Sequence, residues 1–201
     1  MRRIPVLALV LLVTPAADAL DVEQLDGETL AALTHDGPLV AIDEASNGGL
    51  ELATAITVID APPKAVWDTL VDFDTYPEWM PQTTGCVVIA HQGDERLVTT
   101  TLEFDLVITK RVEYTLSYRD LGDYRMEFDR VSGDLDKNEG YWVVRPFRDD
   151  QSILYYANYV DYTSIKLLRS FLKRQPGRGL ALGAGSVAGI ARSVKQRGEN
   201  P

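Results

Sequence analysis

Residues 60–81, DAPPKAVWDTLVDFDTYPEWMP, restrict the possible folds more than any other part of the chain. They follow an alternating apolar run at residues 50–59 that predicts a strand. Pro62 and Pro63 donate no backbone hydrogen bond and hold φ near the helical value, so the strand ends there and a helix begins. The apolar residues that follow recur every three or four positions, which predicts a helix with one buried face.

A second, shorter helical piece is expected between Pro77 and Pro81. It carries three large side chains close together, those of Tyr76, Trp79 and Met80. Proline is well tolerated in the first turn of a helix, whereas a later proline ends it. The first part of the expected fold is therefore one strand followed by two short helices.

After this segment the apolar residues alternate with polar ones, which predicts strands. Further strands are expected at residues 86–90, 96–104, 106–118, 124–131, 141–147 and 153–162, with turns at 92–95 and 121–123 and a polar loop at 132–140. Because the connections are short, these strands and the one at 50–59 predict a seven-stranded antiparallel meander.

The C-terminal part returns to a helical period. Between Ser164 and Arg174 the apolar residues fall on one helical face and basic residues lie opposite, and after a break at 175–177 a second helical run reaches about Lys195. A sheet with one wet face needs a cover for its other face, and this helical part is the natural cover. The fold class is therefore α+β; the pattern leaves open whether the C-terminal helix is one bent piece or two.

Residues 1–19 have the features of an export signal. Arg2 and Arg3 precede a short apolar run, and residues 17–19, ADA, fit a small-x-small cleavage site. The apolar run is much shorter than the roughly twenty residues that span a bilayer, which favours cleavage over an uncleaved membrane anchor. We therefore expect a periplasmic or secreted protein, with residues 20–49 as an N-terminal arm and 50–197 as the main domain.

The charge of the chain restricts its partners. The formal net charge is −10, and residues 1–19 carry two Arg and one Asp, so the remaining chain carries −10 − 1 = −11. This sign disfavours binding to nucleic acid and to anionic lipid surfaces. Cys86 is the only cysteine, so no internal disulfide can form, and we expect a buried, inert thiol.

Few residues point to catalysis. His35 and His91 both fall in predicted turns, and no zinc-ligand spacing is present. The loop from Asp134 begins like a calcium loop, but Glu139 stands where that loop needs glycine and Arg145 where it needs the bidentate Glu. No cofactor and no metal are therefore expected.

A glycine-rich stretch, residues 183–189, GAGSVAG, resembles a phosphate-binding loop in composition only. Such a loop follows a strand, whereas this stretch lies inside a helical pattern. Its small residues would let the helix lie close to the sheet or would leave room for a ligand beneath it.

Three segments together resemble one known family: IDAPPKAVW at 59–67, YPEWMP at 76–81 and NEGYWVVRP at 138–146. The chain resembles the START-like (SRPBCC) superfamily over about residues 53–195, in particular the branch that groups polyketide cyclases with coenzyme-Q-binding proteins. The resemblance implies a helix-grip fold, in which a curved seven-stranded antiparallel sheet wraps a long C-terminal helix. It also implies an apolar cavity between the sheet and that helix.

The implied cavity assigns roles to the inward-facing residues. Tyr76, Trp79 and Met80 would lie near its mouth. Its wall would be formed by Phe104, Lys110, Tyr114, Tyr124, Phe128, Trp142, Asn158 and Phe171. Lys110 either reaches the rim or lies inside, where with Asn158 it would hold the polar head of an amphipathic ligand. For each aromatic residue, ordinary core packing is the alternative.

Three functions remain open. The first is an exported, non-catalytic binding or carrier protein for a hydrophobic small molecule such as a lipid or isoprenoid, and a transient membrane contact would fit it. The second is a polyketide cyclase- or aromatase-like enzyme in which a pocket Tyr or Lys110 acts as acid or base. The third is a packing module whose cavity is filled by its own side chains and whose acidic face binds a protein. The fold alone does not decide between them.

Overall fold

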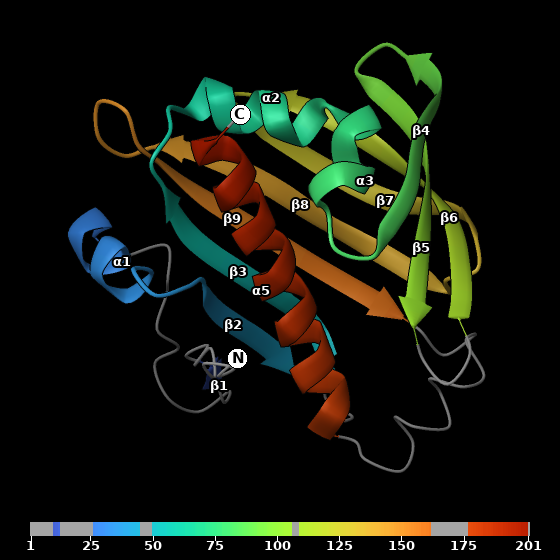
Figure 1. Cartoon of the computed structure of the whole chain (residues 1–201), viewed down its shortest axis with the longest axis horizontal. Helices are drawn as coiled ribbons and strands as arrows, with labels where there is room; N and C mark the ends of the chain where they lie inside the picture. The colour runs from blue at the N-terminus through green and yellow to red at the C-terminus, as the bar shows by residue number, and fades with distance from the viewer. Residues whose placement is uncertain (1–9, 13–25, 45–49, 106–108, 162–176, 201) are drawn as a thin grey trace.

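The computed structural model describes residues 10–12, 26–44, 50–105, 109–161 and 177–200. One open, curved sheet wraps the long C-terminal helix α5 (Gly177–Glu199), as Figure 1 shows. Across the sheet the strands are β1 (Val10–Leu12), β2 (Leu39–Glu44), β3 (Leu50–Ile59), β9 (Ser152–Asp161), β8 (Lys137–Pro146), β7 (Arg125–Gly133), β6 (Thr109–Gly122), β5 (Glu95–Asp105) and β4 (Thr83–Gln92). Only the β1–β2 pair is parallel among these described strands.

The predicted fold class is confirmed. Strands β3 to β9 correspond to the seven expected strands, and β4 to β9 form a meander whose last strand pairs with β3. Strand β2, from the expected N-terminal arm, extends the sheet beyond β3. The only described strand residues from the expected export signal are those of β1, and cleavage of that signal stays a prediction.

One predicted boundary is wrong. The loop expected at 132–140 is shorter, because β8 already begins at Lys137. Asn138 pairs with Val160 and Gly140 pairs with Asn158, so the hairpin with β9 continues through the polar sequence. Pairing gives the backbone groups at this end of β9 hydrogen-bond partners that a loop would not supply.

The turn between β6 and β7 also differs from the one expected at 121–123, because β6 continues to Gly122 and the turn consists of Asp123 and Tyr124. Asp123 and Tyr124 have φ values of 49° and 57°, the left-handed region that a two-residue hairpin turn of type I′ requires at both positions. Tyr124 is therefore a turn residue and not the first residue of the strand, which starts at Arg125.

The segment at 60–81 folds as predicted into helices. Helix α2 (Pro63–Val71) starts with its proline, a 3-10 turn η2 (Phe73–Thr75) follows, and α3 (Tyr76–Trp79) ends the segment. The Tyr76 hydroxyl donates a hydrogen bond of 2.6 Å to the Leu70 carbonyl oxygen, which ties α3 to α2. In Figure 1 these helices lie across one end of the sheet, beside α5.

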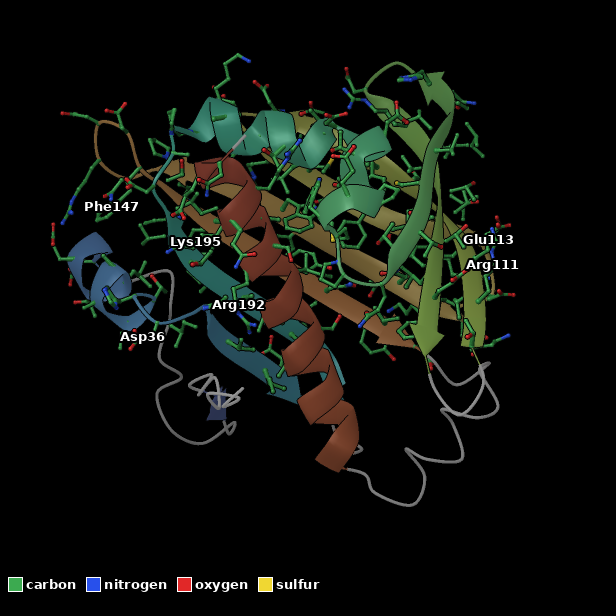
Figure 2. The ribbon with its side chains drawn as sticks, viewed as in Figure 1. Asp36, Arg111, Glu113, Phe147, Arg192 and Lys195 are labelled. Carbon is green, nitrogen blue, oxygen red and sulfur yellow. The ribbon has the colours of Figure 1, made fainter. Side chains whose placement is uncertain are left out.

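The two largest hydrophobic cores of the described residues lie on opposite faces of the sheet. The larger core, on the α5 face, includes Ala55, Leu154 and Val194. The smaller core lies beneath α1 (Gly27–Leu33) and consists of Leu30, Leu39, Ile56, Val58, Ile153 and Tyr155. Alternation along β3 and β9 separates the two sets, because successive side chains point to opposite faces. Figure 2 shows Phe147 beside α1, and Arg192 and Lys195 along α5.

Some expected features lie outside the described residues. These are most of residues 1–25, residues 45–49 at the end of the expected N-terminal arm, the start of the strand at 106–108, and the first helical run at 164–174, which includes Phe171. Within the part of the chain that the structure describes, no helix is long and apolar enough to cross a membrane.

Candidate functional site

A cavity of about 460 Å³ lies between the concave face of the sheet and α5. This volume is in the range of about 300–1,000 Å³ that is usual for small-molecule sites. The described lining residues are Tyr76, Met80, Pro81, Gln82, Thr83, Thr100, Leu102, Phe104, Lys110, Val112, Tyr114, Leu116, Tyr118, Phe128, Leu135, Asn138, Trp142, Tyr156, Asn158, Val160, Gly185, Ser186, Gly189 and Ile190. Most of these side chains are apolar or aromatic, so the cavity suits an apolar molecule.

Two glycines of α5 line this cavity, the exposed Gly185 and the half-buried Gly189. A Cβ atom added at Gly185 or Gly189 would meet no atom within 4 Å. Elsewhere around the helix, Ala188 and Ala191 are buried in the larger core, so α5 packs closely along one stripe only. Of the two readings of the glycine-rich stretch, the structure supports the one in which glycine leaves space beneath the helix.

The opposite wall is rigid and aromatic. The rings of Trp142 on β8 and Tyr156 on β9 stack with centroids 3.8 Å apart and an interplanar angle of 15°. Phe128 continues the wall toward Tyr118, with ring centroids 5.5 Å apart. Packed rings of this kind hold their positions without a ligand, so the wall is formed in advance of binding.

Two tyrosines of the cavity wall stay protonated at neutral pH. Burial raises the pKa of Tyr76 and of Tyr118 well above the ordinary value for a phenol. Desolvation disfavours the charged phenolate and is the main cause in both cases. These two hydroxyl groups can therefore donate hydrogen bonds but are poor bases.

Eight of the eleven predicted site residues lie on the cavity wall. They are Tyr76, Met80, Phe104, Lys110, Tyr114, Phe128, Trp142 and Asn158. Phe171 lies outside the described residues. Whether these eight residues contact a ligand stays a prediction.

Trp79 and Tyr124 pack behind the wall. The Trp79 indole N–H donates a hydrogen bond of 3.1 Å to Thr75 Oγ1, and the Tyr124 ring packs edge-on against Trp67 with centroids 6.0 Å apart. Tyr124 was predicted to line the cavity because of the alternation along its strand. It lies in the turn before that strand, where the alternation does not apply.

Lys110 and Asn158 occupy different environments. Lys110 is exposed, so it lies at the rim of the cavity rather than inside. Asn158 is buried, and its Nδ2 donates a hydrogen bond of 2.8 Å to the Tyr156 hydroxyl. On the outer face of the same strand as Lys110, Arg111 and Glu113 point away from α5 (Figure 2).

Sequence reasoning missed several polar lining residues, among them Asn138. It was placed in a loop, although counting back by two from Trp142 through Gly140 puts it on the cavity face of β8. Pro81 and Gln82, between α3 and β4, and Thr83, the first residue of β4, were also missed, since no periodicity marks a connection.

No metal or reactive-thiol chemistry is evident in the described part of the chain. Its His, Cys, Asp and Glu side chains form no group of three or more that could hold a metal ion. Cys86 is buried as predicted, and burial raises the pKa of its thiol to about 11, so the thiol is protonated at neutral pH.

An open antiparallel sheet that grips a C-terminal helix, with an apolar cavity between them, defines a START-like helix-grip protein. Residues 59–180 match the family described as polyketide cyclase / dehydrase and lipid transport. The chain belongs to this family, which confirms the resemblance. Members of the family bind hydrophobic small molecules.

Several solved structures share the fold. A STAR-related lipid transfer protein from Xanthomonas axonopodis superposes with a TM-score of 0.61 and 12% identity, over 82% of this chain and 94% of that chain. The protein TTHA0849 from Thermus thermophilus gives 0.58 and 19% identity, over 73% and 96% of the two chains. The Zhui aromatase/cyclase from a Streptomyces species gives 0.52 and 12% identity, over 71% and 93%.

At such identities these likenesses establish a common fold and nothing more. No curated protein sequence matches the chain. The family includes both transport proteins and enzymes, so the function has to be inferred from the cavity itself.

Proposed function

We propose that this chain is an exported binding or carrier protein for a hydrophobic small molecule, such as a lipid or an isoprenoid. The ligand lies in the cavity between the sheet and α5. The observation that carries this proposal is the open space next to the half-buried Gly189, opposite a preformed aromatic wall. Empty apolar volume inside a protein forfeits contact energy, and a bound ligand restores those contacts.

The chemistry of the lining supports binding more than catalysis. Its described side chains include only one with a full charge, Lys110, which is exposed at the rim. Tyr76 uses its hydroxyl to hold the Leu70 carbonyl oxygen, which gives this phenol a structural role. A general base near the operating pH requires a group such as His, Glu or Asp within reach of the substrate, and none of these is among the described lining residues.

The experiment is to extract the purified full chain with organic solvent and to identify co-purified molecules by mass spectrometry. We expect a hydrophobic molecule in stoichiometric amount. The matched control is Gly189→Leu, which places a side chain in the cavity and should abolish co-purification while the protein stays folded. Protein that is reproducibly empty, and that binds no member of a lipid panel, would contradict the proposal.

A polyketide cyclase- or aromatase-like enzyme is the second candidate, because Lys110 and Tyr114 lie on the cavity wall and the family includes cyclases. In that case the extracted molecule is converted when returned to fresh protein, and Lys110→Ala stops the conversion. For a carrier, the molecule comes back chemically unchanged, and Lys110→Ala changes neither its structure nor its yield.

Export has its own test. If residues 1–19 are removed during export, the protein recovered from the producing cell begins at Leu20 and lies outside the cytoplasm. An intact N-terminus on protein recovered from the cytoplasmic fraction would refute export and would leave the binding proposal unaffected.

A further inference from the structure

Two buried carboxamides face the cavity. Asn138 is 4% exposed and Asn158 is 9% exposed, and both line the cavity wall. In each residue the side-chain oxygen Oδ1 is buried and accepts no hydrogen bond from any residue that the structure describes. Buried polar atoms are almost always hydrogen-bonded in folded proteins. Two orphan acceptors in one cavity therefore indicate that something else supplies the donors.

The two asparagines that carry these oxygen atoms are neighbours in the sheet. Asn138 on β8 lies opposite Val160, and Asn158 on β9 lies opposite Gly140, so the two asparagines are diagonal neighbours on the same face. Diagonal neighbours of an antiparallel pair lie about 7–8 Å apart, and their Cβ atoms are somewhat closer. Gly140 carries no side chain, so nothing from β8 stands beside Asn158 at its own level of the sheet.

The Asn158 carboxamide has a fixed orientation. Its Nδ2 donates to the Tyr156 hydroxyl at 2.8 Å, and the Tyr156 ring is stacked on Trp142. The other end of the amide, Oδ1, is thereby left as the acceptor. An acceptor held in place by a stacked ring is preorganised, so little conformational freedom is lost when a ligand donates a hydrogen bond to it.

The charge of the lining limits what the donor can be. A carboxylate or phosphate end is an acceptor and would face two oxygen atoms without a counter-charge, since Lys110 is at the exposed rim. An ammonium end would donate, but the described lining has no acidic side chain to pair with it, and an unpaired buried charge is costly. A neutral hydroxyl group satisfies the acceptors without burying charge.

We propose that the cavity selects neutral amphiphiles whose polar end carries hydroxyl groups, and that Asn138 and Asn158 accept the hydrogen bonds of that end. The aromatic wall of Trp142 and Tyr156 and the space beneath α5 take the apolar part. This inference rests on the proposed function, because it describes the ligand that the same cavity binds.

The test is a displacement titration on the full chain with the neutral dye N-phenyl-naphthylamine as reporter. The competitors share one alkyl chain and differ only at the polar end: decyl methyl ether, decanol, the vicinal decanediol and decanoic acid. We expect affinity to rise from the ether to the alcohol to the diol. The diol should bind at least about tenfold more tightly than the ether, since it supplies one donor to each orphan acceptor.

Matched variants assign the preference to the two carboxamides. In the double variant Asn138→Leu with Asn158→Leu, similar volume is kept but both acceptors are lost, so the diol and the ether should bind equally. Thr99→Val is the control, because Thr99 lies outside the cavity lining and its hydroxyl is hydrogen-bonded to the Thr115 hydroxyl. It should keep the preference for the diol.

The wild-type titration decides the proposal even if the double variant does not fold. Equal affinity for the ether and the diol, or tighter binding of decanoic acid than of the alcohols, overturns the assignment and leaves ligand binding intact. If the dye does not bind and no competitor has an effect, the proposed function itself fails.

Discussion

Beneath α1, a glycine has no room for a side chain, whereas beneath α5 two glycines have room to spare. A Cβ atom added at Gly27 would lie 2.0 Å from the Phe147 ring, but one added at Gly185 or Gly189 would meet nothing within 4 Å. The two helices cover opposite faces of one sheet, because Leu30 of α1 packs in the core that contains Ile56, whereas Val194 of α5 packs in the core that contains Ala55. The α1 face is filled by the chain itself, and the α5 face is filled only in part.

We expect the closely packed α1 face to contribute mainly to stability and the open α5 face to serve ligand binding. Close packing on the α1 face contributes stability and leaves no space for another molecule. On the α5 face, helix-disfavouring glycines each cost about 1 kcal/mol relative to alanine, and the space they leave forfeits contacts as well. Substituting valine for glycine at several positions tests this division, because the same two methyl groups meet different surroundings.

The largest effect is expected for Gly140→Val. Gly140 lies on the cavity side of β8, yet a Cβ atom there would come within 2.1 Å of the Ala157 backbone oxygen and 2.6 Å of the Phe128 ring. Because a backbone atom of the paired strand cannot move aside, we expect a loss of at least about 3 kcal/mol in the free energy of unfolding. Urea unfolding measures this loss. If the Gly140→Val variant were as stable as the wild type, the open space would have to extend to the sheet at Gly140.

A smaller loss is expected for Gly27→Val. The obstacle is the Phe147 ring, a side chain that is only partly buried and can turn away at the expense of its packing. We expect destabilisation of about 1–3 kcal/mol in the same urea experiment. The double variant Gly27→Val with Phe147→Ala should recover part of this loss, since the clash is gone; a purely additive result would contradict the steric explanation.

At Gly189 the same substitution should leave stability unchanged or raise it slightly. Valine has a better helix propensity than glycine by a few tenths of a kcal/mol, and its methyl groups enter open space. Gly189→Val should nevertheless weaken binding of N-phenyl-naphthylamine, because it reduces the cavity volume. Gly189→Ala gains helix propensity and keeps most of the volume. A large loss of stability in either variant would show that α5 packs closely there.

The smallest effect concerns the start of α1. Asp26 accepts hydrogen bonds from the Thr29 backbone N–H at 2.9 Å and from the Thr29 hydroxyl at 2.8 Å, and these bonds lower the pKa of Asp26 from its ordinary value. A carboxyl whose pKa is lowered by folding contributes stability above its unfolded pKa and loses it as the pH falls through the folded value.

Asp26→Asn should therefore be slightly less stable than the wild type at neutral pH and equal to it at low pH. Melting temperatures of both proteins across the acid range measure this difference. A constant difference at all pH values would mean that the charge of Asp26 does not stabilise the helix.

Much of the fold followed from local sequence. Pro62 and Pro63 fix the junction between β3 and α2, because proline chemistry acts within one or two residues. Alternation placed Tyr114, Phe128 and Asn158 on the cavity side for a similar reason, since the pleat dictates the direction of each side chain. The sequence did not predict that β8 begins at Lys137, because the pairing of these residues with β9, and not their own composition, makes them part of a strand.

The sequence by itself determined the order of the elements, the faces of the strands and the family, because these depend on periodicity and on short segments with fixed residues. Only the tertiary structure decided that Gly185 and Gly189 border empty space, that Lys110 is at the rim, and that the Asn138 oxygen accepts no hydrogen bond from the described residues. The physical reason is that free volume and unmet hydrogen bonds are properties of the surroundings, which segments far apart in the chain create together.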